Sequence, residues 1–323
     1  GNANVAIGHL AGTSINTGYS NVLIGKQAGY LLTDGADNVA IGLAALDAAN
    51  GGELQNIAIG TNALGTETSG ADGCVAIGHA ALMNQNRDAS ANTAIGYLAL
   101  TNLGNSVDFG GIQNTVVGYQ AGGSGVFGGT TDGGSNEKGS SNTLLGYRSG
   151  YSTTTGKSNV LIGPNAGFAI TDNHDNIAIG AYALDAADGG ENNNIAIGSY
   201  ALSTEAAGAD YCIAIGHSAL ISQNAAVKNT VIGGLAGDAI EGGNDNTLVG
   251  YLSGSAIVDA PGNTAVGQMS YAKGTGSYNT VLGAYAGSSI ENTSTAMSGD
   301  SNVLVGYAAG YKITDGPGNV LIG

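Results

Sequence analysis

The pentapeptide Asn4-Val5-Ala6-Ile7-Gly8 opens a pattern that recurs along all 323 residues of the chain. It occurs in eighteen copies, most of them spaced 16 to 18 residues apart. The later copies begin at Asn21, Asn38, Asn56, Cys74, Asn92, Asn114, Asn142, Asn159, Asn176, Asn194, Cys212, Asn229, Asn246, Asn263, Asn279, Asn302 and Asn319. A short fixed period is typical of repeat architectures, in which each unit buries its apolar residues against its neighbours. The pattern therefore predicts a solenoid.

Each copy keeps the same residue types when positions are counted from the Asn as position 0. Position +1 is always Val, Ile or Thr, position +2 is Ala, Leu or Val, position +3 is Ile, Val or Leu, and position +4 is always Gly. A short β-branched run bounded by Asn and Gly is typical of a strand, and the regular Gly opposes a helix. We therefore predict an all-β fold, a parallel β-solenoid (β-roll) of about eighteen coils of 16 to 18 residues.

Two further positions refine the expected coil. Position +7 is Ala or Ser in every complete unit, so we expect a second, shorter strand through a place where only a small side chain fits. The Asn at position 0 is expected to stack into a structural ladder whose amides satisfy corner backbone groups. The predicted ladder includes Asn4, Asn21, Asn38, Asn56, Asn92, Asn114, Asn142 and Asn159.

The strand residues are apolar on both faces. Positions +1 and +3 share one face and positions 0 and +2 share the other, because side chains alternate along a strand. A strand that is apolar on both faces is covered on both, so one cover is the chain's own coil and the other is expected to be a neighbouring subunit. We expect burial within one chain for Ile59, Ile77 and Ile197 at position +3. We expect burial only against partner chains for Ala58, Leu161 and Leu248 at position +2.

Three segments carry a family resemblance: Asn92-Thr-Ala-Ile-Gly-Tyr97, Asn114-Thr-Val-Val-Gly-Tyr-Gln-Ala-Gly122 and Asn142-Thr-Leu-Leu-Gly-Tyr147. They resemble the NxAIG repeats in the head domains of trimeric autotransporter adhesins, and are similar to the repeat arrays of phage tail-fibre-like proteins. The resemblance implies a trimeric, left-handed parallel β-roll, and hence an in-register homotrimeric rod. It also implies an extracellular location, on a cell surface or a virion.

A larger repeat lies above the short one. The first block, about residues 4–141, matches residues 142–279 with a constant offset of 138, and a partial third block follows. We therefore expect one solenoid over residues 1–323, with inserted loops at 101–113, 123–141 and 288–301. Val126, Phe127 and Met297 are the candidate recognition residues of these loops, and we expect them to project from the coils.

Composition restricts the partners. The formal net charge is −16, with 24 acidic and only eight scattered basic residues, which argues against nucleic acid and anionic membranes. No apolar run has membrane-spanning length. The expected partners are copies of the chain itself and a cell-surface glycan or receptor, and Tyr97, Tyr119 and Tyr147, which follow the motif Gly, could stack on sugars.

The sites that chemistry could use are few. Clustered carboxylates in several turns suggest Ca²⁺ as the one candidate cofactor. The candidate ligands are Asp34, Asp37, Asp172, Asp175 and Asp315. The alternative is that these are ordinary solvated turns, in which Asp is common. Cys74 and Cys212 stand at position 0 of coils too far apart for a disulfide, and are expected to be small buried substitutes for Asn. The alternative is an interchain contact near the axis of an oligomeric rod. His9, His79 and His217 follow the motif Gly and could form a metal-binding ring in an oligomer, or lie in outward polar positions.

No catalytic motif is present, so we expect no enzymatic activity. The sequence favours a non-enzymatic structural fibre or adhesin, such as an extended multivalent segment of a phage tail fibre or bacterial surface appendage. The alternative is a self-assembling extracellular filament built by head-to-tail stacking of solenoid subunits. An ice-binding Thr array is disfavoured because Thr fills only seven of eighteen +1 positions.

Overall fold

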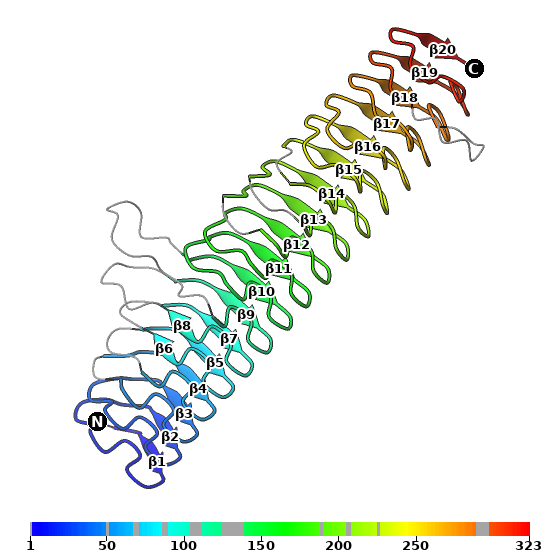
Figure 1. Ribbon diagram of the computed structural model, residues 1–323. Helices are drawn as coiled ribbons and strands as arrows, with labels where there is room; N and C mark the ends of the chain where they lie inside the picture. Colours follow the sequence, from blue (N-terminus) through cyan, green and yellow to red (C-terminus); the bar gives the residue numbers. More distant parts are fainter. Residues whose placement is uncertain are drawn as a thin grey trace, which may run out of the picture. The chain divides into compact units, whose positions relative to one another are not determined.

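The computed structural model describes residues 2–49, 52–66, 71–85, 90–103, 111–124, 139–187, 190–204, 208–224, 227–288 and 297–323. The chain divides into two compact units, Gly1–His174 and Asp175–Gly323, and each is a stack of coils with one strand per motif (Figure 1). In the described ranges there is no helix with the length and apolar character needed to cross a membrane.

The first unit holds nine motif strands, each three residues long and parallel to the next. Equivalent positions pair in register throughout, for example Ala58 with Ala76. The strands are β1 (Val5–Ile7), β2 (Val22–Ile24), β3 (Val39–Ile41), β4 (Ile57–Ile59), β5 (Val75–Ile77), β7 (Thr93–Ile95), β9 (Thr115–Val117), β10 (Thr143–Leu145) and β11 (Val160–Ile162). A second sheet of two short parallel strands joins β6 (Asn84–Gln85) to β8 (Asn102–Leu103).

The second unit repeats the same construction with nine further strands. They also pair in parallel and in register, as Ala196 with Ala214. The strands are β12 (Ile177–Ile179), β13 (Ile195–Ile197), β14 (Ile213–Ile215), β15 (Thr230–Ile232), β16 (Thr247–Val249), β17 (Thr264–Val266), β18 (Thr280–Leu282), β19 (Val303–Val305) and β20 (Val320–Ile322). The predicted parallel β-solenoid is therefore confirmed in both units.

The core lies on the opposite face of the strand from the one we expected. The +2 side chains Ala58, Leu161 and Leu248 are completely buried within the single chain. The +3 side chain of Ile59 is 36% exposed, and those of Ile77 and Ile197 are partly exposed. The expected assignment of the faces was wrong because it left out the ladder. The position-0 Asn points the same way as +2, and its amide finds its partners inside the coil.

The corner after each strand depends on the motif Gly. At Gly60 the backbone has φ of +136°, and a Cβ there would lie 2.4 Å from the carbonyl oxygen of Gly78 in the next coil. No other residue type fits such a close approach of two backbones. The invariant Gly at position +4 therefore marks the corner of each coil.

The segment after the corner is a run of turns, so the expected second strand through position +7 was wrong. Residues at +6 and +8 adopt the left-handed conformation, for example Ala44 and Leu46 with φ of 51°. This backbone reverses too tightly for a strand, but it directs the small +7 side chains, such as Ala45 and Ala63, into the core, where they are fully buried. The expectation that only a small side chain fits at +7 is therefore correct, although the backbone there forms turns and not a strand.

Candidate interaction surfaces

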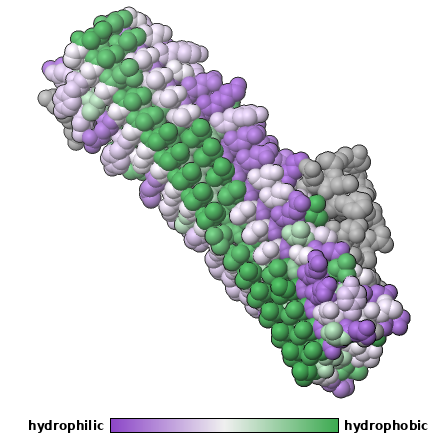
Figure 2. Space-filling view, turned by 180° about the vertical axis from the view of Figure 1, so that it is seen from behind, coloured by the Kyte–Doolittle hydropathy of each residue, from purple (hydrophilic) through white to green (hydrophobic). Residues whose placement is uncertain are grey.

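The outward side chains at +1 and +3 form what we call the apolar ribbon, two adjacent columns of Val, Ile, Leu and Thr. Each coil contributes one residue to each column, and register pairing places like residues side by side, as Ile41 beside Ile59 and Ile59 beside Ile77. Neighbours above and below cover part of each side chain, and Ile59, Ile95 and Leu145 keep 36, 36 and 45% of their surface exposed. Figure 2 shows the ribbon as an apolar stripe bordered by polar residues.

The position-0 Asn residues form the predicted ladder in the interior. Asn21 accepts the backbone N–H of Asn38 at 3.0 Å through its side-chain oxygen, and its Nδ2 donates to the carbonyl of Gly35 at 2.7 Å. One amide thus closes its own coil and joins it to the next. The same pattern recurs along the predicted ladder, which comprises Asn4, Asn21, Asn38, Asn56, Asn92, Asn114, Asn142 and Asn159. These residues are structural and are not available to a ligand.

The two cysteines are free, buried thiols that occupy ladder positions, as expected. In each coil a Gln stands eleven residues further on, and its Nε2 lies 3.6 Å from the sulfur for Gln85 and Cys74, and 3.2 Å for Gln223 and Cys212. Each thiol packs against the side-chain amide of a Gln in its own coil. The thiols are therefore part of the core.

Aromatic side chains at +5 form an exposed stack in the first unit, which we call the tyrosine row. His79, Tyr97, Tyr119 and Tyr147 follow one another with ring centres 5.1, 5.2 and 5.5 Å apart. The separation is close to the spacing of about 4.8 Å between neighbouring strands, because each coil contributes one ring. In the second unit His217 meets Tyr200 edge to face with 6.3 Å between ring centres. These His rings pack on tyrosines.

The Ca²⁺ candidates do not converge. Asp34, Asp37, Asp172, Asp175 and Asp315 are all exposed. Asp34 accepts a hydrogen bond from the Thr17 hydroxyl at 2.7 Å, which is the behaviour of a solvated turn. Within the described ranges, no group of three or more His, Cys, Asp or Glu side chains is placed to hold a metal ion.

The long connections contribute more to the coils than we expected. Val126 and Phe127 lie outside the described residues. Met297, in contrast, is only 2% exposed, and its backbone pairs in parallel with Gly274, so the prediction that it projects was wrong. The carbonyl of Met297 accepts the N–H of Thr275 at 2.8 Å, which makes this residue part of a coil.

The start of the connection 101–113 also belongs to the coils. Leu103 in β8 is 3% exposed and pairs with Gln85 of β6. The spacing between motifs signals extra residues but cannot show where a coil ends and an insertion begins.

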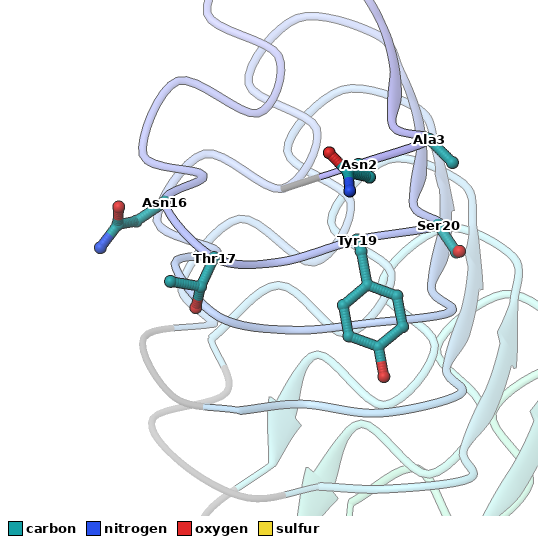
Figure 3. Close-up of a pocket in the computed structure, with 6 residues that line it drawn as sticks. All are labelled: Asn2, Ala3, Asn16, Thr17, Tyr19 and Ser20. Carbon is teal, nitrogen blue, oxygen red and sulfur yellow. The ribbon is translucent and has the colours of Figure 1, made fainter.

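A hollow of about 450 Å³ lies beside the turns that precede β1 and β2. Figure 3 shows its lining residues, Asn2, Ala3, Asn16, Thr17, Tyr19 and Ser20. None of these side chains carries a charge or a nucleophile activated by a neighbouring base. The hollow therefore offers no arrangement that supports chemistry.

Comparison with known proteins adds no identity. No protein-family model, no curated protein and no solved structure matches the chain. The interaction surfaces, above all the apolar ribbon, are therefore the features from which a function can be argued.

Proposed function

We propose that this chain is a non-enzymatic structural fibre segment of the adhesin or tail-fibre type, and that copies of it associate through the apolar ribbon. The observation that carries the proposal is the exposure of Ile59 and its equivalents on the face that turns away from the core. Contiguous exposed apolar surface of this kind marks an interaction site in soluble proteins.

The free energy available from covering the ribbon is large. Complete burial of an Ile or Val side chain contributes about 1.5–3 kcal/mol, so covering the remaining third contributes about 0.5–1 kcal/mol. Each unit has nine such side chains at +3, and Val or Ile also fills six of the +1 positions in the first unit and five in the second, so the gain is on the order of 10 kcal/mol per unit. The estimated cost of association is about 4–15 kcal/mol, so the gain from covering the ribbon of one unit is comparable with that cost. The second unit adds a similar gain.

The periodicity of the ribbon favours a second copy as its cover. The columns repeat at the strand spacing of about 4.8 Å, so a partner must present apolar side chains with the same repeat to fill every gap. Another copy in parallel and in register meets that condition along each unit. The resemblance to adhesin heads supports three copies.

An assembly of this kind supplies reach and many equivalent surfaces for attachment. Multivalent display of weak sites raises overall avidity without any new contact at the single site. The expected target is a glycan or receptor on a cell surface, and the expected location is extracellular, on a bacterial surface or a virion.

Electron microscopy of the purified protein tests this function. We expect discrete particles of uniform length that contain several chains side by side. Indefinite polymers would favour the head-to-tail filament instead. Single separate chains would contradict the proposal.

A further inference from the structure

Arg148 stands out among the basic residues because two aromatic rings lie close to its guanidinium group. It lies at position +6 of the coil that begins with β10. Its guanidinium carbon is 5.3 Å from the centre of the Tyr147 ring and 5.2 Å from that of Tyr151. Its Nε donates a hydrogen bond to Oε1 of Gln120 at 2.9 Å. Three neighbours therefore fix the direction of the guanidinium, which lowers the entropy lost when a ligand binds.

The outer edge of this guanidinium has no acidic partner in the part of the chain that the structure describes. This is notable in a chain with 24 acidic and eight basic residues. The side chain is partly exposed, so its two terminal NH₂ groups can reach a ligand from solvent. A planar guanidinium with two parallel donors matches the geometry of a carboxylate.

The surroundings add groups that recognise sugars. Tyr119 and Tyr147 stack at 5.5 Å and are 45 and 47% exposed, so their ring edges and hydroxyl groups face solvent. Asn165 occupies position +6 of the next coil, and within the described ranges its side-chain amide makes no hydrogen bond. Tyr151 stacks on Phe168 at 5.2 Å and adds a further apolar surface. Amides and phenols bond sugar hydroxyls, and aromatic surfaces pack against sugar C–H groups.

We propose that Arg148, with Tyr147, Tyr151, Gln120 and Asn165, binds the carboxylate group of an acidic saccharide of the uronic acid type. The guanidinium takes the carboxylate, and the amides and phenols take the ring hydroxyls. This inference rests on the proposed adhesive function and names a ligand class for it. Nucleic acid is a poor match because one cation in a chain of net charge −16 does not neutralise a run of phosphates.

The test is titration calorimetry of the full chain with an oligomer of galacturonic acid, and with neutral dextran of equal length as the comparison. We expect binding of the uronic acid oligomer, weakened by added salt, and no binding of dextran. Arg148→Met should weaken binding by about tenfold or more, since a charge-assisted hydrogen bond is lost. Arg148→Lys should give an intermediate loss, because an ammonium group cannot bond in a bidentate manner.

Lys26→Met is the matched control. It removes the same charge at position +5 of the coil that begins with β2, and among the described residues no ring lies over this cation. We expect it to bind like the parent. Absence of binding by the folded parent, equal binding of dextran, or equal weakening by Lys26→Met would overturn the proposal. The molar mass of each sample, measured in parallel, reports the assembly separately, so loss of sugar binding in an intact assembly leaves the fibre proposal standing.

Discussion

The side-chain oxygen of Asn38 accepts the backbone N–H of Asn56 at 3.0 Å, so one amide joins two consecutive coils inside the core. Asn56 does the same for Cys74 at 2.9 Å, and its Nδ2 also donates to the carbonyl of Ala71 at 2.7 Å. Each ladder residue therefore satisfies one donor and one acceptor that the short strands leave without a partner.

Replacing a ladder residue should be costly. Asn56→Leu removes the hydrogen bonds that the Asn56 amide makes with the N–H of Cys74 and the carbonyl of Ala71, at about 1–3 kcal/mol for each buried group. We expect the free energy of unfolding to fall by about 2–6 kcal/mol, measured by denaturant titration. Gln55→Ala, at the exposed neighbouring position, is the control and should change little. Equal stabilities of the two variants would show that the ladder does not stabilise the fold.

Tyr271 is a second buried polar residue that the packing requires. It is fully buried at position +8, its hydroxyl donates to the carbonyl of Gly276 at 2.9 Å, and it accepts from Nδ2 of Asn279 at 2.7 Å. Tyr271→Phe keeps the ring and removes both bonds, so we expect a loss of about 1–3 kcal/mol in unfolding free energy. Tyr278→Phe, at a position 64% exposed, should have no measurable effect.

The half-buried carboxyl of Asp185 should make stability depend on pH. Burial raises the pKa of this group from 3.8 to about 6, and its Oδ1 atom has no hydrogen-bond partner among the residues that the structure describes. Between these two pKa values the folded state holds the proton more tightly than the unfolded state does, so the unfolding free energy falls as pH rises from about 4 to 6.

Asp185→Asn should remove this dependence. We expect the variant to have a higher thermal midpoint than the parent at pH 7 and a smaller difference at pH 4. Asp245→Asn, on an exposed side chain, controls for the change in net charge. A parent midpoint that rises between pH 4 and 6, with no benefit from Asp185→Asn at pH 7, would contradict the role of this carboxyl.

Most of the fold could be predicted from the repeated motif. The spacing of the motif predicts the strands and their register, and the invariant Gly predicts the corner, because these features follow from local backbone chemistry. The inward face was not predictable from the strand alone, since Ala58 and Ile59 are both apolar. Hydrophobicity alone cannot choose between them. The position of the Asn amide decides the choice, and only the structure shows its partners inside the coil.

The interaction surfaces were predictable only in part. The sequence signalled the tyrosine row because Tyr97, Tyr119 and Tyr147 share one motif position. Arg148 was missed because its contact with Tyr151 depends on turns that follow no simple alternation. Met297 looked like part of a loop because of the long gap between motifs, whereas its backbone pairs with Gly274 of the preceding coil and its side chain is buried.

The most direct test of the central claim is the molar mass of the protein in solution, measured by light scattering after size-exclusion chromatography. For the parent chain we expect three times the mass of one chain. For the double variant Ile59→Asp and Ile77→Asp, which places charges in the apolar ribbon and leaves the core face untouched, we expect single chains with an unchanged circular dichroism spectrum. A parent that is a stable single chain, or a double variant of unchanged mass, would contradict association through the ribbon.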